Sequence, residues 1–261
     1  LTFVTAQNTY RYHFNQGNLL IDEKNYSMAL EEFLKAYAID STNANINYKV
    51  GFCYLKAASK KMRATRFLEK AVLNASKKYF DFEPSEKMAP IQAYFAMGQA
   101  YHLEAKYDEA ILNLEKFKSL LSKYQAKESK ETDRMMEWCK TAKQFIANPI
   151  KADIKNMGDS INSPYPDYGP VISADENTLI FTSRRMNGTD TAKAEDGMYY
   201  EDIYIAYKTP EGIWSQPRSI DPNINTKFNE SSIALSADAQ QLLIYKDDNG
   251  GDIYYSNLEI N

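Results

Sequence analysis

Residues 161–185 read INSPYPDYGPVISADENTLIFTSRR, and the first part of this stretch has a copy further along the chain. After a shift of 63 positions it aligns without a gap on residues 224–244, which read INTKFNESSIALSADAQQLLI. A charged segment that contains glycine follows each copy, and the same tripeptide, DIY, comes next at 202–204 and 252–254. The chain after residue 147 is therefore interpreted as two sequence repeats.

Each of these repeats is expected to form several short strands joined by turns. In the first repeat, apolar residues rich in tyrosine and β-branched side chains predict strands near 170–173, at 178–183 and 202–208, and near 213–216. Asp, Asn and Gly supply turn geometry between the strands, most clearly at 174–177. Two such repeats, each of about 50 to 63 residues, indicate blades of a β-propeller.

A different repeat precedes the strands, in residues 8–147, where each unit reads as two helices joined by a short polar turn. Gly17 and Gly51 lie 34 residues apart, and Gly98 has the same place in a third unit. Glycine inside a helix costs roughly 1 kcal/mol relative to alanine, so close packing of two helices is the expected reason for it. Large apolar residues fill the space between the small ones: Phe33, Leu68 and Leu114. Over residues 8–120 the sequence resembles the tetratricopeptide repeat.

The repeats depart from this pattern in one insertion, near residues 74–88, which precedes the third unit. Its aromatic residues, Tyr79, Phe80 and Phe82, are expected to plug a gap between repeats, with contact to a partner as the alternative. Residues 131–147 then predict an amphipathic helix that caps the stack and ends before Pro149. Its apolar residues lie near helical spacing: Met135, Trp138, Cys139, Ala142, Phe145 and Ile146.

The resemblance implies a concave groove, formed by the first helix of each repeat, that binds protein partners. The groove positions carried over to this sequence are Arg11, Phe14, Asn18, Asn45, Tyr48, Phe52, Lys56, Gln92, Phe95, Gln99 and His102. Packing between repeats is the alternative interpretation for Tyr48, Phe52 and Phe95. Where some of these repeats bind a C-terminal carboxylate, only Asn18 matches the residues they use, so this chain is not expected to bind chaperone tails.

The strand repeats carry a narrower resemblance, in SPYPDYGPVISADENTLIFTSRR, EGIWSQP, INTKFNE and DIY. These motifs are similar to the WD-repeat-like propeller attached to tetratricopeptide repeats in periplasmic proteins of bacteria with the type IX secretion system. An OmpA-like peptidoglycan-binding domain usually follows in that family, which includes the PorE-type subunit. The resemblance implies a scaffold associated with the outer membrane that binds protein partners of a secretion or gliding complex and links it to peptidoglycan. PorE-type proteins are lipoproteins, and this sequence shows no anchoring cysteine.

The predicted organisation is therefore an α-solenoid, residues 8–147, followed by the first two blades of a β-propeller, residues 148–261. A propeller closes with roughly 4 to 8 blades, so two blades leave a sheet face to be covered by further blades or by another chain. Residues 1–7, LTFVTAQ, resemble the tail of a signal peptide, with a frayed strand or an expression remnant as the alternative.

Composition excludes several classes of function. The chain has 261 residues, 44% of them hydrophobic and 25% charged, as in an ordinary folded protein. Residues 1–147 hold 22 Lys and Arg against 17 Asp and Glu, but the basic residues are interleaved with acids, so binding of nucleic acid is not expected. The apolar stretches are far shorter than the roughly 20 residues of a membrane-spanning helix.

The sequence shows no motif for catalysis, for a cofactor or for a metal. His13 and His102 lie on separate repeats, and Cys53 and Cys139 are far apart, so neither pair indicates a metal site. An enzymatic activity is not expected. The alternatives are a glycan-binding module, using exposed tyrosines and Trp214, and the propeller subunit of a serine peptidase.

Two charged groups in the strand repeats leave their roles open. Asp247, Asp248 and Asp252 could bind calcium through their oxygens, but the Asn-Gly sequence between them favours a hairpin turn. Arg184 and Arg185 are expected either to pair with acids between blades or to contact a partner.

Overall fold

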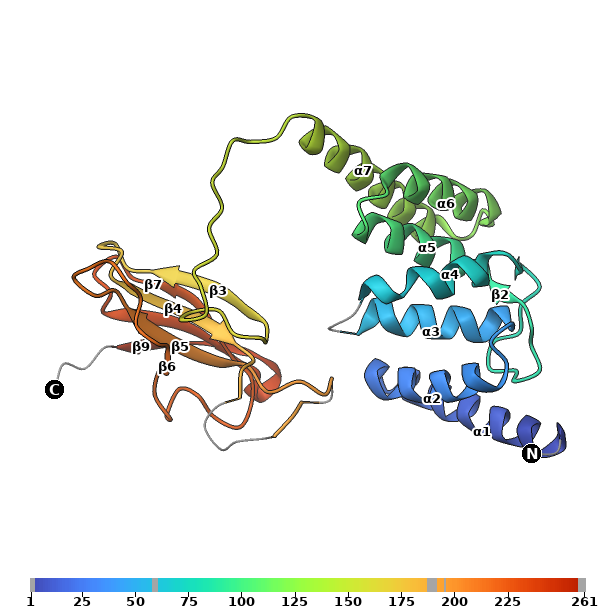
Figure 1. Ribbon diagram of the computed structural model, residues 1–261, viewed down its shortest axis with the longest axis horizontal. Helices are drawn as coiled ribbons and strands as arrows, with labels where there is room; N and C mark the ends of the chain where they lie inside the picture. The colour runs from blue at the N-terminus through green and yellow to red at the C-terminus, as the bar shows by residue number, and fades with distance from the viewer. Residues whose placement is uncertain (1–2, 58–60, 187–191, 195, 258–261) are drawn as a thin grey trace. The chain divides into compact units, whose positions relative to one another are not determined.

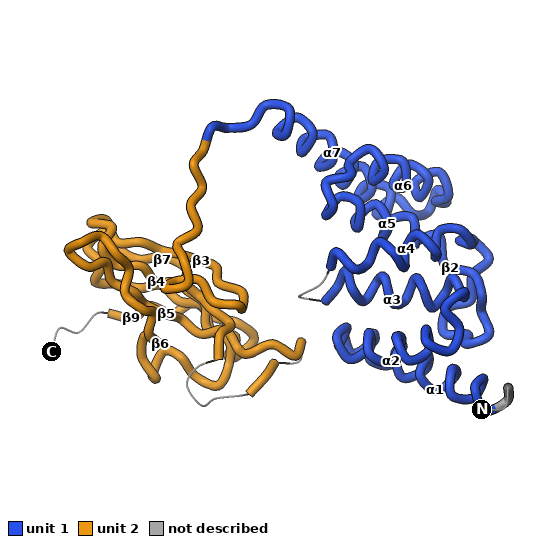
Figure 2. Tube along the Cα trace, viewed as in Figure 1, with its two compact units in different colours: residues 1–151 blue, residues 152–261 orange. Residues whose placement is uncertain are grey.

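The structure is a computed structural model that describes residues 3–57, 61–186, 192–194 and 196–257. The chain divides into two compact units, residues 1–151 and residues 152–261 (Figure 2). The first unit consists mainly of helices and the second of β-strands (Figure 1). A helical region followed by a β-sheet region is thus confirmed.

The described part of the first unit contains seven α-helices, each packed against the next one along the chain (Figure 1). They are α1 (Phe3–Asp22), α2 (Tyr26–Ile39), α3 (Ala44–Lys56), α4 (Thr65–Val72), α5 (Gln92–Leu103), α6 (Tyr107–Leu120) and α7 (Ala126–Ala147). A short parallel strand pair, β1 (Ala75–Ser76) and β2 (Ala89–Pro90), lies between α4 and α5 in the chain. A 3-10 turn, η1 (Lys61–Arg63), precedes α4. Asparagine caps start two of the helices: Asn25 accepts a hydrogen bond from the Met28 N–H, and Asn43 accepts from the N–H groups of Asn45 and Ile46.

The first helix bears on the predicted signal-peptide remnant, residues 1–7. Residues 3–7 belong to α1, so the alternative of a frayed strand is wrong for them, and residues 1–2 lie outside the described residues. The signal-peptide interpretation stays a prediction. At the other end of the unit, α7 begins at Ala126, five residues before the predicted capping helix, and packs on α6 through Met135 and Cys139.

The glycines of the helical repeats lie where two helices touch. A Cβ atom on any of them would come within 2.5 to 2.7 Å of a buried side chain on the second helix of the hairpin, closer than real contacts allow. The three pairs are Gly17 with Phe33, Gly51 with Leu68, and Gly98 with Leu114. The packing reason for these glycines is therefore confirmed.

Two antiparallel sheets make up the second unit (Figure 1). The first has the order β3 (Asp167–Ile172), β4 (Thr178–Ser183), β5 (Asp202–Tyr207) and β6 (Arg218–Ser219), and the second has the order β7 (Glu230–Leu235), β8 (Gln241–Lys246) and β9 (Asp252–Asn257). The fourth strand, predicted near 213–216, is found two residues later as β6. In the predicted range Trp214 forms an isolated bridge to Lys208, and β6 begins after Pro217, which has no N–H to donate to a ladder.

The first two strands of each sheet, and the turn between them, are structural copies of each other. Strands β7 and β8 follow β3 and β4 by 63 positions, as the sequence repeat predicts. The turns between them match in detail, because Ser173 Oγ donates to Asp175 Oδ1 over 2.5 Å and Ser236 Oγ donates to Asp238 Oδ1 over 2.6 Å. The residue after each aspartate has a positive φ, +59° and +57°.

One face of the first sheet packs against the second sheet. Ile180, Ile203 and Ile205 form a buried cluster there with Leu242 and Ile244. The opposite face of the second sheet carries large apolar side chains that are between 36% and 69% exposed: Leu243, Tyr245, Ile253 and Tyr255. In the described residues the second sheet thus has one covered and one open apolar face.

The two arginines after β4 pair with acids of their own unit. Arg184 binds Asp196 through both terminal nitrogens, at 2.5 and 2.9 Å, and Arg185 lies 2.8 Å from Asp167. Burial raises the pKa of Asp167, but its hydrogen bonds and Arg185 outweigh burial and hold this pKa below its usual value. Glu230 has the same place in the second repeat but no arginine beside it, and burial raises its pKa. Both arginines thus pair with acids, but within the first repeat and not between the two repeats, so the expected pairing between blades is not observed.

Candidate partner-binding groove

The predicted groove residues lie on α1, α3 and α5, the first helices of the three hairpins, and differ widely in exposure. Arg11, Lys56 and Gln92 are exposed, and Phe14, Asn18 and Asn45 are buried. The remaining five are half-buried: Tyr48, Phe52, Phe95, Gln99 and His102. Only part of the predicted set is therefore accessible at the surface of these helices.

Phe14 is corrected from a groove residue to a core residue. Its side chain is fully buried, with the ring stacked on Tyr10 at a centroid distance of 6.0 Å and edge-on to Phe33 at 6.1 Å. Phe52 lies against Tyr26 of the preceding repeat, as the alternative of packing between repeats predicts, and also against Tyr48 of its own helix. Phe95 lies against Phe117 of its own hairpin, so this contact is packing within a repeat.

The insertion before α5 covers one end of α3. The Tyr79 hydroxyl donates to Asn45 Oδ1 over 2.9 Å, and Lys49 Nζ lies 2.7 Å from Asp81 Oδ1. Phe80 and Phe82 do not bury their rings, which are 69% and 55% exposed. The prediction that the insertion plugs a gap holds for Tyr79 and is wrong for the two phenylalanines.

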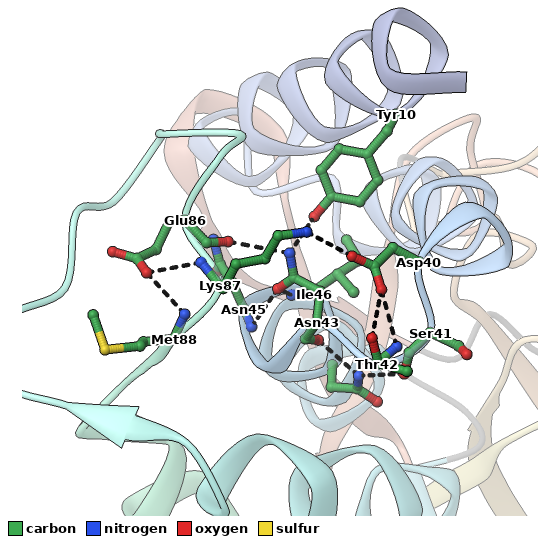
Figure 3. Close-up of polar contacts among 11 residues, drawn as sticks. Tyr10, Asp40, Ser41, Thr42, Asn43, Asn45, Ile46, Glu86, Lys87 and Met88 are labelled. Atoms are coloured by element: carbon green, nitrogen blue, oxygen red, sulfur yellow. Dashed lines mark hydrogen bonds and ion pairs between the residues drawn. The ribbon is translucent and has the colours of Figure 1, made fainter. Parts of the chain in front are cut away.

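A set of polar contacts fastens this insertion to the helices around it (Figure 3). The Glu86 carboxylate accepts from the N–H groups of Lys87 and Met88, both over 2.8 Å. Asn43 Nδ2 lies 3.1 Å from both the Glu86 carbonyl and the Tyr10 hydroxyl, and it donates to each. Asn43, the N-cap of α3, thereby connects the insertion to the start of α3, and the same side chain also binds Tyr10 of α1.

The other end of α3 lies beside an open cleft of about 240 Å³. Three of its lining residues are among the predicted groove residues: Lys56, Gln99 and His102. The others are Lys61, the 52% exposed Trp138 and three apolar side chains, Leu55, Leu103 and Met135, so the cleft combines two lysines with an apolar and aromatic lining.

Trp138 is the cleft residue that the sequence assigned to the wrong face. It was expected on the apolar face of the capping helix, but the buried positions of α7 are Thr132, Met135 and Cys139. Trp138 precedes Cys139 by one residue, which turns it about 100° away from that face. Met135 and Cys139 are four residues apart and mark the buried face of the helix. The offset of Trp138 from this pair could have predicted its exposure from the sequence.

The described residues contain no cluster of three or more His, Cys, Asp or Glu side chains that could hold a metal ion. His13 Nδ1 lies 2.7 Å from Glu32 Oε2, and His102 Nδ1 lies 3.3 Å from Cys139 Sγ. Around Asp248 the chain forms the expected tight turn, with a positive φ of 48° at Asn249. Among the helices that the structure describes, none is both long and apolar enough to span a membrane.

The family comparison agrees with the hairpin geometry. A model of the tetratricopeptide repeat matches residues 10–43 and 91–120, which cover the hairpins α1–α2 and α5–α6. These two segments are tetratricopeptide repeats. The α3–α4 hairpin between them has the same contact of a glycine with a buried leucine.

Other comparisons add little. A search of curated proteins gives no match. Among solved structures, the chain is similar to the Sgt2 TPR domain from Aspergillus fumigatus, at 19% identity and a TM-score of 0.37, over 57% of this chain and 91% of that one. It is also similar to MamA protein, at 18% identity and a TM-score of 0.35, over 56% of this chain and 79% of that one.

Asn18 gives a prediction about the groove, because both polar atoms of its buried amide have no hydrogen-bond partner among the described residues. A buried polar group without a partner costs about 1–3 kcal/mol, so Asn18→Leu should raise the free energy of unfolding by about 1–2 kcal/mol. Urea denaturation of the full chain measures this. Gln99 has the corresponding position in α5 but is half-buried, so Gln99→Leu should change the free energy of unfolding far less. A loss of stability in Asn18→Leu would show that the amide is satisfied after all.

Proposed function

We propose that this chain is a non-enzymatic scaffold that binds protein partners through the groove of its tetratricopeptide repeats. The observation that carries the proposal is the cleft at the end of α3, where Lys56, Lys61 and Trp138 converge on open space. A half-exposed tryptophan beside two lysines suits an acidic partner segment that carries an apolar or aromatic side chain.

The sheet unit is proposed to contribute the first two blades of a β-propeller. In support, the two sheets repeat in sequence and in turn geometry, and they pack face to face through Ile203 and Ile244. The open face of the second sheet is where a following blade would pack. The glycan-binding alternative loses support, because Trp214 is half-buried and packs against the cluster of Phe181 and Tyr204.

The cellular role is proposed from the sequence motifs that the two strand repeats share with the periplasmic family. The scaffold is placed in the periplasm, associated with the outer membrane, where it binds protein partners of a type IX secretion or gliding complex. A PorE-type arrangement would link that complex to peptidoglycan through a downstream OmpA-like domain. Fractionation of the source cells tests the location, and recovery of the protein with cytoplasmic markers contradicts it.

Cross-linking tests the groove. With a photoreactive amino acid in place of Trp138, the full chain should form adducts with envelope proteins of its source cells. Reversing both lysines of the cleft, Lys56→Glu with Lys61→Glu, should lower the adduct yield about tenfold, because it removes the charge complementarity. Lys116→Glu, on the exposed surface of α6, is the matched control and should leave the yield unchanged. Equal yields from the charge-reversed and control variants would contradict binding at this cleft.

A further inference from the structure

The insertion before α5 occupies positions that a partner of the groove would otherwise contact. Tyr79 and Asp81 bind Asn45 and Lys49, which lie four residues apart on one face of α3. Asn45, a predicted groove residue on α3, therefore lies against this one segment, residues 77–87, which we call the groove loop.

Lys49 sets the chemistry of this contact. Its side chain is only 6% exposed, and a buried ammonium group is costly unless a carboxylate pairs with it. Asp81, which supplies the carboxylate, is itself 50% exposed, and its pKa is lowered because the hydrogen bond and charge of Lys49 outweigh partial burial. Lys49 Nζ also lies 5.4 Å from the centroid of the Phe82 ring. This face of α3 thus binds a carboxylate with an aromatic group beside it.

The hold of the groove loop on α3 is small in extent. Phe80 and Phe82 keep more than half of their surface exposed, so the loop buries little apolar area. Phe82 has a φ of +63°, a conformation that residues other than glycine rarely adopt. The loop is fastened independently at its far end, where the Glu86 carbonyl accepts from Asn43 and Lys87 pairs with Asp40, so Tyr79 and Asp81 can leave α3 without loss of that anchor.

We propose that this face of α3 is a second partner site, which binds an extended segment with a tyrosine and an acidic residue two positions later, and that the groove loop occupies it in the absence of that partner. The proposal rests on the proposed function, since it assigns a ligand class to the same groove. The groove loop is part of the same chain, so it competes for the site with an effective concentration of the order of millimolar. A partner can bind only the molecules whose site the loop has left, so its apparent affinity falls as the loop occupies the site more often.

The test uses the full chain and a labelled synthetic peptide with the sequence of residues 77–87, KKYFDFEPSEK. The variant Tyr79→Ser with Asp81→Ser, in which the loop can no longer occupy the site, should bind this peptide at least about tenfold more tightly than the wild type in fluorescence anisotropy. Phe80→Ser, which changes an exposed ring of the same loop, should behave as the wild type. A peptide with serine at the tyrosine and aspartate positions should not bind any form.

A second variant covers the case in which the double replacement disturbs folding. Asp81→Asn keeps the shape of the side chain but removes the charge that pairs with Lys49, and it should give a smaller gain of about threefold in peptide affinity. Adding Lys49→Met to either variant should abolish binding. Equal peptide affinity in the wild type and the variants, or none in any of them, would overturn the proposal. Cross-linking at residue 138 is independent of this result, so the scaffold function can hold while this inference fails.

Discussion

Asn225→Ala is expected to lower the free energy of unfolding of the sheet unit by about 2–3 kcal/mol. The Asn225 amide accepts from the Ile203 N–H and donates to the Ile203 carbonyl, both over 2.8 Å, and it also donates to Ser219 Oγ. Ile203 is fully buried between the two sheets, so its N–H would lose its acceptor where water cannot replace it. Hydrogen exchange of the β5 amides in the full chain measures the effect on this unit alone.

The sequence repeat supplies a matched control for this prediction. Asn162 has the same place in the first repeat, but it is only half-buried and donates to the exposed Asn156. Asn162→Ala should therefore change stability by less than about 0.5 kcal/mol. Equal losses of stability at the two positions would show that the hydrogen bonds between Asn225 and Ile203 do not contribute to the stability of the sheet unit.

The contact of Asn225 with β5 bears on the propeller interpretation. In the second sheet, Ile253 has the place of Ile203, but it is 68% exposed and belongs to β9, the edge strand of that sheet. If a further blade follows, an asparagine equivalent to Asn225 would bind Ile253 in the same way. In a longer form of the protein, burial of the Ile253 side chain would therefore support the propeller interpretation.

Local patterns explain why much of the fold could be predicted from the sequence. Helical periodicity and the glycine at the crossing of each hairpin depend on neighbours within one repeat. The contact of Gly51 with Leu68 can therefore be predicted from the sequence of that repeat alone. The turn at Asp175 recurs at Asp238 because serine and aspartate at fixed offsets form the same hydrogen bonds. Such features need no knowledge of distant contacts.

The accessible groove could not be predicted in the same way, because distant residues decide it. The position of Phe14 on α1 is that of a groove residue, yet packing on Phe33 closes it off. Tyr79, Phe80 and Phe82 look alike in the sequence, and only the hydrogen bond from Tyr79 to Asn45 decides which ring turns inward. Side-chain direction in an insertion depends on the partners that the fold brings to it.

Gly51→Val should lower the free energy of unfolding of the helical unit by about 3 kcal/mol. The first added carbon would lie 2.6 Å from Leu68 Cγ and 2.7 Å from Leu68 Cδ2, and Leu68 is fully buried. Its neighbours in the core include Val50, Cys53 and Phe67, so the side chain has no space into which to move. The gain in helix propensity on losing glycine is only a few tenths of a kcal/mol and does not offset the overlap.

A double-mutant cycle in the full chain, measured by urea denaturation and helical circular dichroism, separates this overlap from a general effect of valine. Leu68→Ala alone should cost about 2–5 kcal/mol, because it leaves a cavity at the crossing of α3 and α4. Combined with Gly51→Val, it provides the space that valine needs, so the two losses should sum to about 1–2 kcal/mol more than the double variant shows. Strict additivity would mean that the α3–α4 hairpin yields elsewhere and that the glycine is not required for the close approach of these two helices.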